Sequence, residues 1–210
     1  PRKVGQDLHV RAMLMGRVVQ RGDSLNIQTE LVDVGEVSQL WGQQYNGKFT
    51  EIPAVQEEIA KRVSEKLHLR TTSAEQQRLG KHYTENAEAY QLYLKGRYYW
   101  NRRTADLLKK ADEYFEQAIE KDPGYGLAYA GLAESYALFS VYEVVPPGES
   151  CPKAKAAGMN ALEIDENLGD AHAALGWIKM SCDWDWAGSE REFKRALEIN
   201  PNDGTARQWY

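Results

Sequence analysis

Several features that would assign a function are missing from this sequence. No apolar run approaches the roughly 18 residues that a membrane-spanning helix needs, and no charged-then-apolar leader opens the chain. A Gly–x–x–x–x–Gly–Lys–Ser/Thr phosphate-binding run and a His–Glu–x–x–His zinc helix are also absent. The four histidines are scattered along the chain. We therefore expect no enzyme, no metal, no cofactor and no membrane contact in this segment, and the sequence leaves its compartment open.

Charge is modest and is not concentrated in one block. The formal net charge is −5, with 10 basic and 9 acidic residues in positions 1–70 and 16 and 22 in positions 71–210. Nucleic-acid binding needs a basic surface that contacts phosphates, and this distribution argues against one. The chain starts without methionine and ends within what would be a further helix. We expect a piece of a larger protein.

One pattern of small and large residues occurs three times in the second half. The first copy consists of Gly96, Tyr99, Ala111, Phe115, Ala118 and Pro123. The second consists of Leu132, Ala133, Tyr136, Ala154, Ala161 and Glu166, and the third of Leu175, Gly176, Ser189, Phe193, Ala196 and Pro201. Antiparallel helices approach closely only where side chains are small. The pattern therefore indicates stacked helix pairs, with a six-helix bundle as the alternative.

The expected helices cover most of positions 87–210. They lie near 87–101, 104–121, 125–142, 149–164, 168–182 and 186–199, with a truncated seventh from 203. This organisation predicts repeats at about 87–123, 124–166 and 167–201, and a truncated fourth from 202. Asn86 can cap the first helix. Thr72–x–x–Glu75 has the form of a capping box, which indicates a helical linker over 71–86.

Residues 1–70 follow a different period. A short helical segment around Val4–Leu8 precedes two β-rich runs, Ala12–Val19 and Leu25–Val34, which are separated by a turn at Arg21–Ser24. A third run covers 37–45, and an apolar stripe of spacing three and four predicts a helix over about 53–69. The expected fold class is α+β: a small three-stranded antiparallel sheet with helices, followed by an all-α solenoid of about three repeats.

The helical part resembles the tetratricopeptide repeat, a two-helix unit of about 34 residues. Segments such as Tyr90–Tyr98 and Asp183–Gly188 resemble the arrays attached to bacterial signalling proteins. Residues 9–70 resemble the second half of the TolB amino-terminal-like (FlgO-like) domain in Gly16–Val18, Leu31–Asp33, Leu40–Gly42 and Val55–Ile59. The resemblance implies an accessory region of a bacterial serine/threonine kinase, nucleotide cyclase or winged-helix regulator. A serine/threonine kinase is the expected parent.

The resemblance also implies a binding surface on the first helix of each pair. Its usual inward positions fall on Tyr90, Tyr93, Arg97, Trp100, Asn101, Leu127, Ala130, Glu134, Leu138, Asp170, Ala173, Trp177 and Met180. Tyr, Trp and Arg dominate the energetics of many protein interfaces. We expect a protein or peptide partner, which could be another region of the parent chain, and about half of the aromatic residues should pack against the next repeat. The alternative is that the segment organises an oligomer, such as a homodimer, through the α+β domain.

The connections within the helix pairs are irregular. The small residue of each first helix and the small residue opening each second-helix pattern lie 15, 21 and 13 residues apart, where about 12 is usual for the resembled repeat. The extra residues map to Asn101–Arg103 and Val144–Gly148. Insertions on one edge of a solenoid can carry function, and neutral extension is the alternative because added loop length costs little entropy.

Three short motifs have both a functional and a structural interpretation. Arg21–Gly22–Asp23 matches an adhesion tripeptide, but Gly and Asp also favour a tight turn. Asp183–Trp186 lacks the further oxygen ligands of a calcium loop, so we expect Asp185 to cap a helix and both Trp residues to wedge between helices. His172 occupies a position often held by Trp in the repeat, and we expect it to pack rather than to bind a ligand.

The chain contains two cysteines, Cys151 and Cys182. They lie 15 residues before and 16 residues after the turn expected near Glu166, so the antiparallel helices that carry them could bring them together. A bridge requires Cα atoms no more than about 7 Å apart. Two free cysteines are the ordinary case in a reducing compartment. The sequence favours free thiols and leaves a disulfide open.

Overall fold

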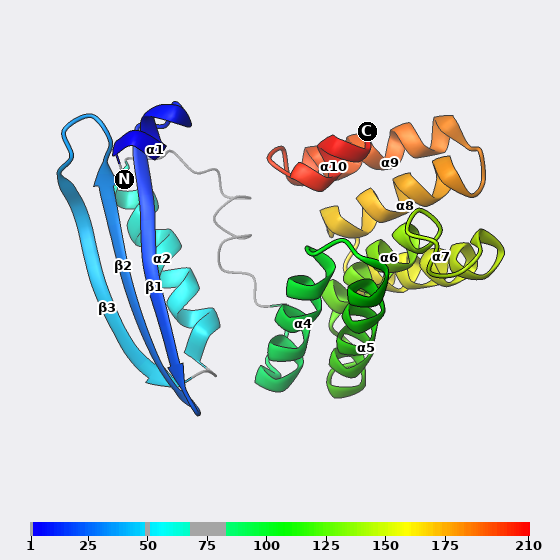
Figure 1. Ribbon diagram of the computed structural model, residues 1–210, viewed down its shortest axis with the longest axis horizontal. Helices are drawn as coiled ribbons and strands as arrows, with labels where there is room; N and C mark the ends of the chain where they lie inside the picture. The colour runs from blue at the N-terminus through cyan, green and yellow to red at the C-terminus, as the bar shows by residue number, and fades with distance from the viewer. Residues whose placement is uncertain (1, 49–50, 68–82) are drawn as a thin grey trace. The chain divides into compact units, whose positions relative to one another are not determined.

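The computed structural model describes residues 2–48, 51–67 and 83–210 (Figure 1). It divides into two compact units, residues 1–82 and 83–210. The described elements of the first unit are α1 (Arg2–Asp7), β1 (Ala12–Arg21), β2 (Ser24–Asp33), β3 (Gln39–Lys48) and α2 (Ile52–Lys66). Those of the second unit are α4 (Ala87–Trp100), α5 (Ala105–Lys121), α6 (Gly126–Phe139), α7 (Pro147–Ile164), α8 (Gly169–Ser181), α9 (Trp186–Ile199) and α10 (Gly204–Trp209).

The three strands form an antiparallel sheet in the order β1-β2-β3. Arg21 pairs with Ser24 around the two-residue turn at Gly22 and Asp23, and Gly22 has a φ of +61°, as tight hairpin turns require. The strand predicted over 37–45 begins at Gln39 instead. Val37 has a φ of +52°, so the preceding turn extends through it.

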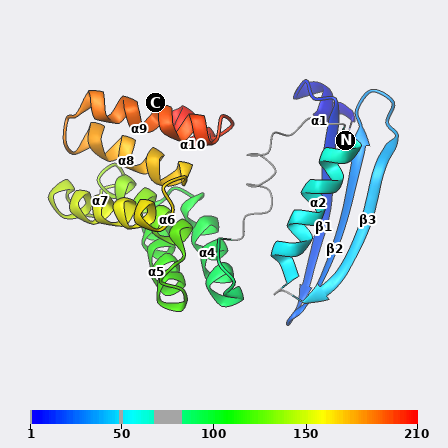
Figure 2. The ribbon, with the colours of Figure 1, turned by 180° about the vertical axis from the view of Figure 1, so that it is seen from behind.

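Helix α2 lies along one face of the sheet (Figure 2). Leu25, Ile27 and Leu31 are buried and alternate along β2, as a strand with one covered face requires. The register pairs Val18 with Ile27 and Leu14 with Leu31, which places the β1 residues on the same face. Leu14 and Val18 nevertheless remain 49% and 64% exposed. The apolar face of the sheet is therefore covered over β2 and left open over β1.

Phenylalanine side chains fill the spaces left by glycines in the second unit. A Cβ atom on Gly96 would meet the Phe115 ring at 2.5 Å, and one on Gly131 would meet the same ring at 2.7 Å. A Cβ atom on Gly176 would meet the Phe193 ring at 2.9 Å. Glycine lets the helices of a pair approach so closely that the ring of one packs against the backbone of the other. The small and large residues of the repeated pattern therefore do pack against each other.

The helices associate in the pairs α4/α5, α6/α7 and α8/α9, and α10 follows. The first helices also contact one another in sequence, α4 with α6, α6 with α8, and α8 with α10. The predicted fold class is confirmed: a three-stranded antiparallel sheet with helices precedes an array of helix pairs. The predicted capping box at Thr72–Glu75 lies outside the described residues.

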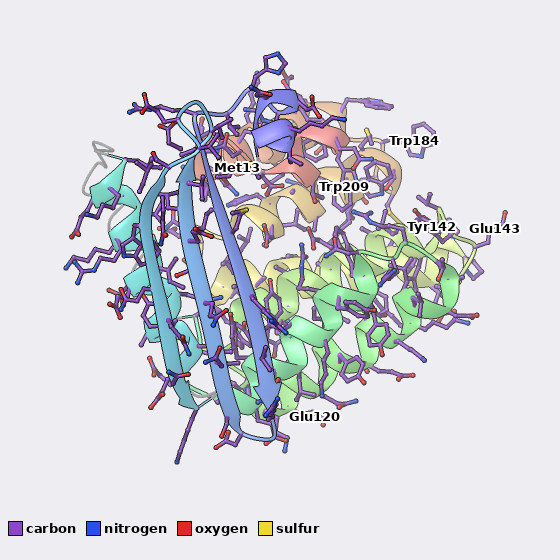
Figure 3. All side chains as sticks on the ribbon, turned by 60° about the vertical axis from the view of Figure 1, so that its left-hand side comes forward. Met13, Glu120, Tyr142, Glu143, Trp184 and Trp209 are labelled. Atoms are coloured by element: carbon purple, nitrogen blue, oxygen red, sulfur yellow. A yellow bond between two sulfur atoms is a disulfide. The ribbon has the colours of Figure 1, made fainter. Side chains whose placement is uncertain are left out.

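Two predicted caps are present. The Asn86 side chain accepts hydrogen bonds from the Glu88 and Ala89 amides, and the Asp185 side chain accepts one from Gly188. The prediction that Trp184 and Trp186 wedge between helices is wrong. They are 72% and 60% exposed, in the segment where Asp183 pairs with Lys155 and Asp185 caps α9. Figure 3 shows Trp184 projecting from the ribbon.

Cys151 and Cys182 are bridged, which corrects the expectation of free thiols. The two sulfurs lie 2.03 Å apart and the two Cα atoms 6.1 Å apart. Cys151 belongs to α7, and Cys182 is the C-cap of α8. The antiparallel packing of α7 and α8 supplies this proximity.

His172 is hydrogen-bonded as well as packed. Its Nδ1 lies 2.7 Å from Glu192, and Lys179 contacts the other carboxylate oxygen of Glu192 at 2.5 Å. The hydrogen bond from His172 and the charge of Lys179 lower the pKa of Glu192 to about 2, against the opposing effect of burial. His172 therefore joins α8 to α9 through its hydrogen bond to Glu192.

Asp112 is a buried acidic residue between α5 and α6. Its Oδ1 has no hydrogen-bond partner among the described residues, although Ser135 supplies one side-chain hydrogen bond. Burial raises the pKa of Asp112 from 3.8 to about 8, and the Ser135 hydrogen bond opposes this rise. The folded protein therefore keeps a proton at neutral pH that the unfolded chain releases.

This shift predicts the effect of Asp112→Asn. Below about pH 4, Asp112 is protonated in both the folded and the unfolded state, so its ionisation does not change the free energy of unfolding. As the pH rises towards 8, the unfolded chain ionises more readily than the folded protein, and the free energy of unfolding falls. We expect Asp112→Asn to raise the free energy of unfolding by about 1–3 kcal/mol at pH 7 and to flatten its pH dependence between 4 and 8. Urea unfolding across this range measures both effects. The exposed neighbour Glu113, changed to Gln, is the control, and an equal response of the two variants would contradict the assignment.

Candidate functional site

The first helices bring five acidic, basic and aromatic side chains into one cluster. Tyr93 and Arg97 come from α4, Glu134 from α6 and Asp170 from α8, and all four interact electrostatically. Asp203, the N-cap of α10, interacts with Glu134 and Asp170. We call the surface that carries Tyr90 and these five residues the first-helix face. Four helices that are distant in sequence build it.

Arg97 and Glu134 form an ion pair at the centre of this face. Only 1% of the Glu134 side chain is exposed, whereas 24% of Arg97 is. Burial raises the pKa of Glu134, and the adjacent Arg97 guanidinium opposes this rise and favours the ionised carboxylate. Burial disfavours the charge on Arg97, but Glu134, Tyr93 and Asp170 together outweigh burial and raise the pKa of Arg97. Arg97 therefore stays cationic and presents the accessible part of the pair.

The carboxyl groups of Asp170, on α8, and Asp203, at the start of α10, interact with each other. Burial raises the pKa of Asp170, Arg97 lowers it, and Asp203 raises it again. The Asp203 side chain also accepts a hydrogen bond from the Ala206 amide at 3.0 Å. The start of α10 thus supplies a residue of the face that the sequence analysis had not selected.

Trp100 lies beneath two arginines instead of facing solvent. The Cζ atom of Arg97 lies 4.5 Å from the Trp100 ring centroid, and that of Arg103 lies 3.7 Å away. Cations over an indole face are attracted by the ring quadrupole. Trp100 is 1% exposed, so its predicted role as a contact residue is wrong: the two guanidinium groups cover it. Arg103, within the insertion noted at Asn101–Arg103, is half-buried and covers the ring together with Arg97.

Tyr93 packs against aromatic residues of the array and also interacts with the charged residues Arg97, Asp170 and Glu134. Its ring lies 5.9 Å from Phe115 and 5.2 Å from Tyr125, measured between centroids. Burial is the main reason that its pKa is raised. Tyr90 is half-buried and adjoins the cluster of Ala89, Ala118, Tyr125 and Ala128. Both tyrosines therefore border the face, and Tyr93 also contributes to the core.

The remaining predicted residues divide between core and surface. Leu138, Ala130 and Ala173 are buried, so their predicted roles as contact residues are wrong; in the array these positions are turned towards the neighbouring helices. Trp177 is half-buried, donates from Nε1 to the Ala137 carbonyl at 3.2 Å and packs on Trp209 at 5.2 Å. Asn101 is exposed and caps α4, and Leu127 and Met180 are half-buried.

The face can hold a peptide by hydrogen bonds and ring stacking. Arg97 and Arg103 offer planar donors, and Tyr90 and Tyr93 offer amphipathic rings. Among residues 2–48, 51–67 and 83–210, no group of three or more His, Cys, Asp or Glu residues could hold a metal ion. No described helix has the length and apolar character to cross a membrane.

Comparison with curated proteins finds a relative that is much longer than this chain. A Rhizobium meliloti (strain 1021) protein described as "Putative adenylate cyclase 3" is 28% identical over 132 residues, which cover 63% of this chain and 22% of the relative. The chain therefore spans about a fifth of that relative's length. No family model matches the chain.

Solved structures similar to this chain include three tetratricopeptide domains. The first TPR of Spaghetti (RPAP3) bound to HSP90 peptide SRMEEVD has a TM-score of 0.45 and 17% identity, covering 58% of this chain and 86% of that one. The Arabidopsis OM64 TPR domain has a TM-score of 0.46 and 17% identity, covering 58% and 90%. The first TPR domain of human RPAP3 has a TM-score of 0.46 and 17% identity, covering 58% and 85%.

Proposed function

We propose that this chain is a protein- or peptide-binding scaffold that uses the first-helix face. One observation carries the proposal: Tyr93 and Arg97 from the first repeat interact with Asp170 from the third, and Tyr90 and Asp203 adjoin them. Arg97 is held by a buried carboxyl group and supported from below by Trp100, so the guanidinium is preorganised. The occupant would be an extended peptide or a partner helix.

We further propose that the scaffold is an accessory region of a bacterial signalling protein. Similarity to part of the Rhizobium meliloti relative supports a nucleotide cyclase as the parent, and a serine/threonine kinase stays a prediction from the sequence. The partial TolB-like domain over 1–70, the linker over 71–86 and the repeat boundaries belong to the same proposal.

A phage-displayed peptide library panned against the whole chain tests the binding proposal. Calorimetry would then compare a selected peptide on wild type, Tyr90→Ala and Tyr114→Ala. Both tyrosines are half-buried, but Tyr114 lies on α5 and stacks on Tyr99 at 5.4 Å. We expect about 10-fold or greater weakening for Tyr90→Ala, in the range of an interface anchor, and little change for Tyr114→Ala. Equal affinities of all three proteins for the peptide would contradict the proposal that the first-helix face is the binding site.

A second candidate function, self-association through the first unit, is favoured by the open side of the sheet. Among the described residues, no strand pairs with the outer edge of β1, and Leu14 and Val18 are exposed beside it. Unpaired edges of this kind pair readily with another chain. Light scattering of wild type and Val18→Lys tests this: a dimer that the substitution dissociates supports it, and a monomeric wild type contradicts it.

A further inference from the structure

The Cys151–Cys182 bridge joins two exposed connections of the array. Cys151 lies in the second turn of α7, just after the α6–α7 connection, and Cys182 precedes the α8–α9 connection. Figure 3 labels Tyr142 in the first connection and Trp184 in the second. Both bridged residues are half-buried rather than enclosed. Part of each cysteine residue is therefore accessible to solvent.

The surroundings of Cys182 disfavour a thiolate. Cys182 is the C-cap of α8, where the last carbonyl groups carry partial negative charge. The next residue, Asp183, adds a carboxylate. Ser181 Oγ lies 3.7 Å from the Cys182 sulfur, but its hydrogen is donated to the Trp177 carbonyl at 2.8 Å. The Ser181 oxygen thus adjoins this sulfur, and the negative end of α8 and the Asp183 carboxylate belong to the same stretch of chain.

The surroundings of Cys151 are of opposite character. Helix α7 begins at Pro147, so Cys151 lies towards its positive end. Lys155 is one turn further along, and residues four apart lie on the same side of a helix. Lys155 Nζ contacts both Asp183 oxygens, at 2.8 and 2.7 Å, which brings the two segments together beside the bridge. Cys151 therefore lies near the positive end of α7 and Cys182 at the negative end of α8, and the Lys155–Asp183 ion pair links the two segments.

We infer that the bridge is a thiol–disulfide exchange site with a fixed direction: an incoming thiolate attacks Sγ of Cys182, and Cys151 leaves. The attacking sulfur forms a bond to the Cys182 sulfur as the Cys151–Cys182 bond breaks, and the bonding electron pair departs on Cys151 as a thiolate. A second thiol of the reductant then attacks the mixed disulfide and releases Cys182. Two electrons and two protons convert the bridge to two thiols, and a dithiol or two monothiols supply them. The better-stabilised thiolate leaves faster.

The bridge lies near Trp177, which is a residue of the predicted binding surface. Cys182 and Trp177 pack against one cluster of Ala137, Ala154, Leu175 and Ile178. In an oxidising compartment the bridge persists, and a glutathione-reduced compartment holds thiols. Reduction frees the first turns of α7 from the end of α8, beside Trp177.

Peptide mapping after brief reaction with glutathione tests the direction of attack. The oxidised chain is treated with excess glutathione, quenched with acid and labelled with N-ethylmaleimide. We expect most single adducts to carry glutathione on Cys182 and maleimide on Cys151. The same chain unfolded in urea is the matched control, because loss of the helices should make the two sulfurs nearly equivalent.

Two variants test whether the neighbouring charges set the direction of attack. Asp183→Asn and Lys155→Gln should each shift adducts towards Cys151, whereas the exposed and more distant Glu163→Gln should leave the ratio unchanged. Glutathione found mainly on Cys151, or equally on both sulfurs in the folded chain, would overturn the inference. A chain whose thiols stay free in oxidised glutathione would overturn it too.

Discussion

Phe115→Ala should lower the free energy of unfolding of the helical unit by about 3–5 kcal/mol, the range for removing a buried phenylalanine. Phe115 is fully buried, and its ring fills the spaces opposite both Gly96 and Gly131. One side chain therefore joins α4, α5 and α6. The glycines cannot close the cavity, since their backbones are already fixed in helices. Thermal and urea unfolding of the whole chain would measure the loss.

Lys109→Ala, on the same helix, is the matched control. Lys109 is exposed, so its removal should change stability by less than about 0.5 kcal/mol. A small loss for Phe115→Ala would mean that the ring does not bridge the two pairs. The helices would then be held by contacts other than those between glycine and phenylalanine.

Replacing both bridged cysteines by serine should cost about 3–4 kcal/mol. The bridge closes a loop with a sequence separation of 31, and the chain-entropy estimate for such a loop falls in this range. The loop contains most of α7 and all of α8, so its release loosens two repeats. Unfolding of oxidised wild type and of Cys151→Ser/Cys182→Ser gives the difference.

Wild type in a strong reductant provides an internal check on the serine variant. Reduced wild type and the double variant should unfold at the same denaturant concentration, because each lacks only the cross-link. Oxidised wild type that is no more stable than the double variant would show that the bridge does not constrain the unfolded chain.

Elements with a local physical cause were predictable. The glycine and alanine positions identified the helix pairs because only small residues permit close helix contacts, and the Gly96–Phe115 packing follows from that rule. Asn86 and Asp185 were predicted as caps from residue type and position, and both accept the expected amide hydrogens. The β-rich run Leu25–Val34 was likewise predicted, and it forms β2 over Ser24–Asp33.

Features that depend on distant partners were not predictable. Trp184 and Trp186 are exposed, and the adjacent Asp183 pairs with Lys155 on another helix, a contact that no local pattern reveals. The cysteines are bridged because α7 and α8 pack at a separation that spacing in the sequence leaves open. Leu138 and Trp100 are buried because neighbouring helices and Arg103 cover them. The positions taken from the resembled repeat identified which side of each first helix is involved. They did not show which residues on that side are buried by other parts of the protein.

The most direct measurement of the central claim is a pair of photo-crosslinking experiments with a peptide selected on the whole chain. A photoreactive phenylalanine analogue would replace either Tyr90, on the first-helix face, or Glu120, which is exposed on α5 and labelled in Figure 3. The account predicts peptide adducts from position 90 and none above background from position 120. Adducts from position 120 alone, with equal affinity of both proteins for the peptide, would contradict it.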